Sequence, residues 1–190
     1  MTIELWLVRH GETEWSKTGQ HTGRTDLPLT EVGIAKAKEL RRLLDGQKFE
    51  AVFTSPLKRA AETCRLAGFE NPTVDPNLQE WDYGAYEGKT THDIRKERPD
   101  WDLWRDGVEN GESIDEVARR ADQVIESAVS VAQSGRVALF AHGHILRVLT
   151  ARWLSLTPDY AKRFALTTAS LSILSYERDT RVISRWNQTT

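Results

Sequence analysis

The chain has 190 residues, 39% of them hydrophobic, which suits one compact domain with a sizeable core. Its 26 basic and 28 acidic residues give a formal charge of -2, so no global field attracts nucleic acid or a membrane surface, and we expect neither partner. Cys64 is the only cysteine, which excludes internal disulfides and cysteine-based zinc sites and favours a reducing compartment. The opening apolar run, residues 3–8, is too short for a signal segment or membrane span, so we predict a cytoplasmic protein.

The first third of the chain alternates strand-like and helix-like segments. Residues 3–8 form a short apolar run that ends in Arg-His-Gly, as a buried strand entering a loop does. Thr30 is placed to cap a helix that runs to about residue 45. Residues 51–54 predict a second strand, and the Ser-Pro pair after them predicts a second helix with proline in its first position. This order predicts a right-handed crossover and a parallel strand pair.

The remainder predicts an excursion followed by further core elements. Residues 80–112 are rich in Trp, Gly and charge, which indicates a lid with short helices rather than a core layer. Residues 113–134 place apolar side chains on one face and predict a long amphipathic helix. Residues 137–141 predict a buried strand that leads into a helix ending near residue 154. The segments 171–176 and 181–186 predict a terminal hairpin at a sheet edge.

These elements predict a single α/β domain over residues 1–190. We expect a three-layer sandwich in which a mostly parallel central sheet carries helices on both faces, with the excursion lying over the active site.

Two predicted strands end in a histidine, and two arginines also lie close to the ends of predicted strands. The carboxyl ends of parallel strands line the ligand crevice of such a sheet, so His10 and His142 should meet at one rim. For either histidine taken alone, a structural capping role is the favoured interpretation. Arg9 adjoins His10, and Arg59 lies one turn into the second predicted helix, near an N-terminus that favours anions. Because arginine offers planar bidentate donors, the four side chains together indicate a phosphate site, although an exposed helical position would also explain Arg59.

Four sequence blocks resemble the signatures of the histidine phosphatase superfamily, which includes the phosphoglycerate mutases. They occur in the family's order, at residues 7–13, 54–63, 78–88 and 142–147. The resemblance implies that His10 accepts the phosphoryl group and that Glu80 protonates the leaving group. It also implies a phosphate pocket formed by Arg9, Arg59 and His142. The chemistry of phosphoryl transfer adds the expectation that His142 is protonated, because the pocket must supply positive charge. On this basis we expect a phosphomonoester hydrolase that needs no metal ion and no cofactor.

The family resemblance leaves three functions to separate. Mutases follow the acid block with leucine and an Asn-Lys pair, and later carry paired arginines. Here those places read Ala-Tyr-Glu-Gly at residues 85–88 and Trp-Arg-Asp-Gly at residues 104–107, which favours hydrolysis. A phosphoglycerate mutase is the alternative, and a phosphate-binding module without catalysis is a third, weaker candidate.

The segment after the first block resembles sugar-bisphosphatases and broad acid phosphatases. Ser16 stands where mutases carry asparagine, and its hydroxyl is expected to donate one hydrogen bond to the phosphate. Thr22 and Gly23 are expected to present backbone N–H groups to the substrate. Arg147 would hold a distal phosphate, or would face solvent as an ordinary helical residue. The expected substrate-binding set is Ser16, Thr22, Gly23, Tyr83, Gly143 and Arg147.

Some residues near these blocks have simpler explanations. Glu87 is expected to cap the chain near Thr90, and Trp101 and Trp104 are expected to pack the excursion. The histidine pair at residues 142 and 144 lacks a carboxylate cluster, so no metal site is expected. The predicted partner is a small phosphorylated metabolite, a sugar phosphate or bisphosphate, and the sequence leaves the choice between monomer and homodimer open.

Overall fold

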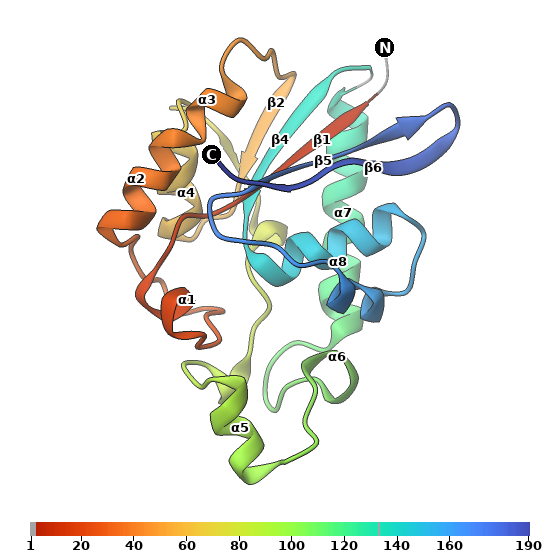
Figure 1. The fold of residues 1–190 in the computed structure, drawn as a ribbon. Helices are drawn as coiled ribbons and strands as arrows, with labels where there is room; N and C mark the ends of the chain where they lie inside the picture. Colours follow the sequence, from red (N-terminus) through yellow and green to blue (C-terminus); the bar gives the residue numbers. More distant parts are fainter. Residues whose placement is uncertain (1–2, 133) are drawn as a thin grey trace.

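The computed structural model describes residues 3–132 and 134–190 (Figure 1). Its central sheet has the order β3-β2-β4-β1-β5-β6. Strands β1 to β4 run parallel, and the terminal hairpin of β5 and β6 adds two antiparallel strands at one edge, as predicted. The strands are β1 (Glu4–Arg9), β2 (Ala51–Thr54), β3 (Thr73–Val74), β4 (Arg136–Ala141), β5 (Leu171–Glu177) and β6 (Thr180–Gln188).

The predicted direct pairing of the first two strands is wrong, because β4 lies between them. Leu139 of β4 pairs with Leu7 of β1 on one side and with Phe53 of β2 on the other. Five of the six residues of β4 are buried, so this strand occupies the centre of the sheet, where both faces are covered. The short edge strand β3 carries no sequence signal and was not predicted.

Helices cover both faces of the sheet, which confirms the three-layer α/β architecture. Side chains alternate along β1, so that Leu5 and Leu7 pack towards α7 and α8 while Trp6 and Val8 pack towards the α2–α4 side (Figure 1). The helices are α1 (Glu14–Thr18), α2 (Glu31–Glu39), α3 (Arg41–Leu44), α4 (Lys58–Leu66), α5 (Thr91–Glu97), α6 (Leu103–Asp106), α7 (Ile114–Ala132) and α8 (Gly143–Trp153). None of the helices among the described residues combines the length and apolarity that a membrane crossing needs.

Two helix boundaries differ from those expected. Thr30 does cap α2, since its side chain accepts a hydrogen bond from the Gly33 N–H, but the helix breaks at buried Leu40 before α3 begins. The second helix, α4, begins at Lys58 rather than at the Ser-Pro pair, because Ser55 Oγ accepts the Leu57 N–H and forms a turn instead. Arg59 is therefore the second residue of α4, not one turn inside it.

The excursion forms short helices, as expected, at the end of the molecule where the parallel strands finish (Figure 1). It contains α5, α6 and a 3₁₀ turn at Gly84–Tyr86. Trp101 is buried and packs edge-on against Tyr86, and Trp104 packs edge-on against Trp81. The packing role predicted for both tryptophans is confirmed.

Candidate active site

His10 follows the last residue of β1 and presents a neutral imidazole. Its Nδ1 lies 2.6 Å from the carbonyl oxygen of Gly11, which only accepts hydrogen bonds, so Nδ1 carries the proton. Burial, together with the charges of Arg9 and Arg59, holds the pKa of His10 well below its usual value. The Nε2 lone pair is therefore available for nucleophilic attack.

Arg9 carries a buried nitrogen that lacks a partner. Its Nη1 donates to the Leu166 carbonyl, but buried Nε makes no hydrogen bond within the described residues. Buried polar groups normally find partners, so this unpaired N–H leaves the guanidinium with spare hydrogen-bonding capacity in a residue that lines a cavity. Gly143, the first residue of α8, lies beside this guanidinium: a Cβ atom there would stand 3.3 Å from Arg9 Cζ.

Arg59 is fully buried, so the exposed-helix explanation for it does not hold. Its Nε donates to His142 Nδ1 at 3.0 Å. Its Nη groups donate to three backbone carbonyls of one loop, those of Thr22, Gly23 and Thr25. The arginine therefore fastens this loop to α4 and orients His142 at the same time.

His142 meets His10 as predicted, with the ring centroids 5.1 Å apart. Because its Nδ1 accepts from Arg59, the proton sits on Nε2, which donates to Ser55 Oγ at 2.8 Å. Burial, and then the charges of Arg59 and Arg9, lower the pKa of His142 well below its usual value. The prediction of a protonated His142 is therefore wrong, because two arginines already supply the positive charge at this point.

Glu80 is buried, with 5% of its surface exposed, and it binds the start of α8. One carboxylate oxygen accepts the N–H groups of Trp81 and Ile145, at 3.0 and 2.9 Å. The other accepts the His144 N–H at 2.9 Å. The carboxyl group thus caps a helix N-terminus beside the histidine pair, a contact that the sequence alone did not reveal.

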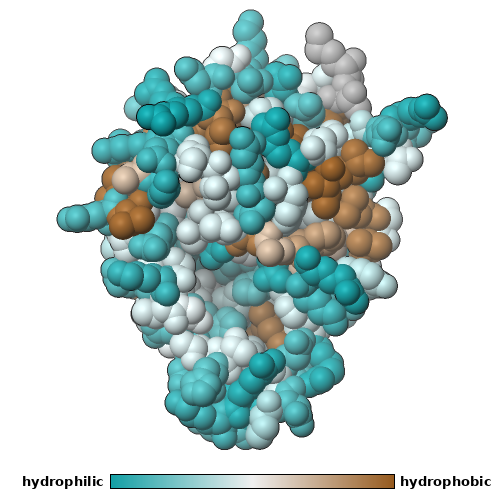
Figure 2. All heavy atoms as spheres, viewed as in Figure 1, coloured by the Kyte–Doolittle hydropathy of each residue, from teal (hydrophilic) through white to brown (hydrophobic). Residues whose placement is uncertain are grey.

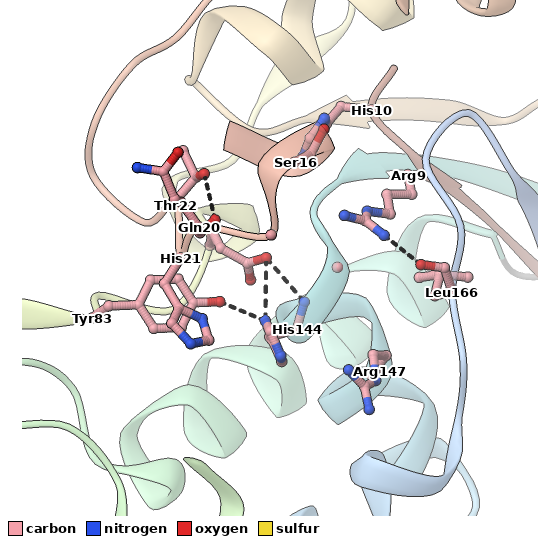
Figure 3. A pocket seen from close by; sticks show the side chains of 13 residues that line it. Arg9, His10, Ser16, Gln20, His21, Thr22, Tyr83, His144, Arg147 and Leu166 are labelled. Carbon is pink, nitrogen blue, oxygen red and sulfur yellow. Dashed lines mark hydrogen bonds and ion pairs between the residues drawn. The ribbon is translucent and has the colours of Figure 1, made fainter. Parts of the chain in front are cut away.

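Of these groups, Arg9, His10 and Glu80 line a small cavity of about 180 Å³. Figure 2 shows the surface hollowed between the body of the domain and the excursion, and Figure 3 shows the side chains inside. Arg59, His142 and Gly23 lie behind the cavity wall rather than in it. The lining consists of Arg9, His10, Ser16, Gly19, Gln20, His21, Thr22, Glu80, Tyr83, Gly143, His144, Arg147 and Leu166.

Two of the expected substrate contacts are engaged elsewhere. Ser16 lines the cavity, but its hydroxyl donates to the Thr13 carbonyl and accepts the Thr13 N–H within the capping box of α1. The Gly23 N–H donates to Glu87 Oε1 at 2.8 Å, so it is not presented to a substrate.

The loop-capping role expected for Glu87 is confirmed, but the loop that it caps is not the one near Thr90. Its carboxylate accepts the N–H groups of Gly23 and Thr25, and Asp93 completes the cap at Thr90 instead. Glu87 therefore holds, through N–H groups, the same loop that Arg59 holds through carbonyls. A carboxylate from the excursion and a guanidinium from α4 thus fix one wall of the cavity.

The far end of the cavity combines a polar pair with a second arginine (Figure 3). Burial raises the pKa of Tyr83 well above its usual value, so the phenol keeps its proton, and its hydroxyl is hydrogen-bonded to His144 Nδ1. Arg147 lies over the Trp104 ring, 4.7 Å from its centroid, and donates through Nε to the Ala161 carbonyl. Its Nη groups make no hydrogen bond within the described residues. The side chain is half-buried, which excludes the expectation that it simply faces solvent.

Sequence reasoning missed two histidines in this wall. His21 packs against Tyr83 with the ring centroids 4.8 Å apart, and burial lowers its pKa to about 4. His144 pairs with Tyr83 and packs against Trp104. The spacing from His142 at the start of a helix was a usable signal for His144, whereas His21 sits in a loop whose path no local pattern reveals.

A doubly wound sheet that brings a neutral buried histidine, an arginine and a buried carboxyl group to one cavity fits the chemistry of phosphoryl transfer. The chain belongs to the histidine phosphatase superfamily (branch 1), whose family model matches residues 5–189. It is a phosphoric monoester hydrolase.

Relatives of the chain support this assignment. The chain is 40% identical over 182 residues to an acid phosphatase of Mycobacterium tuberculosis, covering 95% of this chain and 90% of the relative. It is 36% identical over 212 residues to sedoheptulose 1,7-bisphosphatase of Saccharomyces cerevisiae, covering 95% of this chain and 77% of that enzyme. The solved structure of the open reading frame Rv3214 from Mycobacterium tuberculosis superposes with a TM-score of 0.93 at 39% identity, covering 98% of this chain and 97% of the other.

Proposed function

We propose that this phosphatase hydrolyses sugar phosphates and bisphosphates through a phosphohistidine formed at His10. The observation that carries the proposal is that one cavity is lined both by a neutral His10, whose Nε2 makes no hydrogen bond among the described residues, and by the Arg9 guanidinium, whose Nε is also without a partner among them. A phosphoryl group placed there would meet a nucleophile and a matching cation together.

The arrangement supports two steps. In the first, His10 Nε2 attacks phosphorus, the bond to the leaving oxygen breaks, and that oxygen takes the proton of Glu80. In the second, water attacks the phosphohistidine, the N–P bond breaks, and Glu80 recovers a proton from the water. Arg9 neutralises the phosphoryl oxygens, while Arg59 and His142 support the pocket from behind through their mutual hydrogen bond.

The other end of the cavity supports a substrate with a second polar or anionic group. Arg147 brings a second guanidinium, whose Nη groups make no hydrogen bond in the part of the chain that the structure describes, and Tyr83 and His144 line the same cavity. The names of the two relatives, an acid phosphatase and a sugar bisphosphatase, agree with this class. We place the activity in the cytoplasm, in keeping with a single buried cysteine that forms no disulfide.

The test is a panel of phosphorylated metabolites assayed for release of inorganic phosphate by the purified protein. Fructose 1,6-bisphosphate and sedoheptulose 1,7-bisphosphate should be hydrolysed with higher kcat/KM than 3-phosphoglycerate. Interconversion of 2- and 3-phosphoglycerate without net phosphate release would show a mutase instead. Phosphate binding without turnover of nitrophenyl phosphate would show a non-catalytic module.

A further inference from the structure

The backbone that carries Glu80 is held from behind by a residue of α7. Arg120 Nη1 donates to the carbonyl oxygens of Asn77 and Gln79, at 2.6 and 2.9 Å. Its Nη2 also lies 3.5 Å from the carbonyl oxygen of Glu80. One guanidinium therefore holds the segment that leads into Glu80.

Arg120 is itself fixed by Glu112, at the end of the excursion. Its Nε and Nη2 donate to the two carboxylate oxygens of Glu112 at 2.7 and 2.8 Å, which is a bidentate pair. The two side chains are only 18% and 16% exposed. Glu112 reaches the other side of Glu80, because its carboxylate accepts the Asp82 N–H and its backbone carbonyl accepts the Trp81 indole N–H.

The pair therefore binds the chain on both sides of Glu80 without entering the cavity. Neither Arg120 nor Glu112 belongs to the lining, so neither contacts a substrate held there. The carboxyl group of Glu80 is fixed separately, by the N–H groups at the start of α8. The backbone beside Glu80 is thus held by a side chain of α7, and the Glu80 carboxyl group is held by the start of α8. These two helices pack against each other.

We propose that the Arg120–Glu112 pair is a positioning device for the proton donor, an inference that rests on the proposed role of Glu80. A general acid must lie within hydrogen-bond reach of the leaving oxygen, and a displacement of about 1 Å is enough to cost on the order of 10²-fold in rate. A loosened segment at residues 77–82 lets Glu80 move away from that oxygen while His10 and Arg9, on β1 and its loop, stay in place. The consequence is a defect confined to substrates whose leaving group needs a proton.

The experiment compares an alkyl phosphate, such as glycerol phosphate, with nitrophenyl phosphate, whose leaving group departs without a proton. Arg120→Gln should lower kcat for the alkyl ester by about 10-fold or more relative to the nitrophenyl ester. Arg119→Gln is the matched control: it is the neighbouring residue on α7, it is largely exposed, and its ion pair is with Glu116. This control should keep the wild-type ratio of the two rates.

Three further variants keep the outcome decisive. Arg120→Lys retains the charge but loses the planar fork, so it should share the selective loss; a wild-type ratio there would overturn positioning through the fork. Glu112→Gln, nearly isosteric, should show the same loss and decides the matter if Arg120→Gln does not fold. In a protein that already carries Glu80→Gln, Arg120→Gln should cause no further decrease in kcat for the alkyl ester.

Glu80→Gln alone separates this inference from the proposed function. If Glu80→Gln lowers both rates equally, the proton-donor role of Glu80 fails. If Glu80→Gln is selective for the alkyl ester but the Arg120 and Glu112 variants lower both rates equally, the positioning role fails by itself.

Discussion

Replacement of Arg147 by methionine is the sharpest probe of the proposed distal subsite. The side chain lies over the Trp104 ring, and only its Nε is committed within the described residues, to the Ala161 carbonyl. Methionine keeps an unbranched apolar stem over the tryptophan while it removes the guanidinium. The change therefore deletes the proposed contact to a remote phosphate with little loss of packing.

The expected magnitude follows from the contact that is lost. A hydrogen bond to a charged group contributes about 1.5 to 3 kcal/mol, and truncation of a buried charged contact costs about 2 to 5 kcal/mol. Because Arg147 is half-buried, we take about 2 to 3 kcal/mol. At 1.4 kcal/mol for each factor of ten, this predicts a decrease of about 30- to 140-fold in kcat/KM for a sugar bisphosphate.

The assay is steady-state phosphate release with fructose 1,6-bisphosphate and with nitrophenyl phosphate. The loss should fall mainly on KM for the bisphosphate, because binding of the remote group is equal in the ground and transition states, while nitrophenyl phosphate should change little. Arg163→Met changes an exposed arginine at the end of the 3₁₀ segment Pro158–Arg163, and it is a matched control for loss of one positive charge. Equal losses on both substrates, or a bisphosphate loss below about 3-fold, would refute a distal subsite at Arg147.

Three further predictions concern the reaction centre and its pH range. Protein denatured in alkali during turnover should carry a phosphate that is stable in alkali and labile in acid, and His10→Ala should abolish it together with activity; wild-type turnover in that variant would disprove the nucleophile. Activity should survive exhaustive chelation, because arginines are proposed to supply the positive charge, and a loss that only a divalent ion restores would contradict this. The free energy of unfolding should fall as pH drops below about 6.5, because the unfolded chain then binds protons that the buried histidines exclude. The pKa of His21 is lowered to about 4. Its contribution to the free energy of unfolding is therefore fully present above pH 6.5 and is lost as the pH falls from 6.5 to 4. Denaturant unfolding of His21→Gln should therefore show a shallower pH dependence, by up to about 1.4 kcal/mol per pH unit in that window, and an unchanged slope would refute the assignment.

Local patterns were enough to predict most of the architecture and the catalytic candidates. Strand 51–54 and the Thr30 cap came from apolar runs and a capping side chain, signals that act over a few residues. The meeting of His10 and His142 followed from a topological rule, since parallel strands end at one edge. The four family blocks then indicated which residues at that edge belong to the reaction.

Other properties depended on contacts between segments far apart in the chain. The insertion of β4 between β1 and β2 was decided by burial on both faces of the central strand. The neutral state of His142 depends on a hydrogen bond from Arg59, which is 83 residues away in the sequence. The Gly23 N–H is unavailable to a substrate because it donates to Glu87, which is 64 residues away. Protonation and hydrogen-bond commitment depend on which groups share a low-dielectric space, so they become defined only when the chain has brought those groups together. The sequence by itself thus determined which residue types stand at the ends of the strands, and only the tertiary structure decided which of their polar atoms remain free for a substrate.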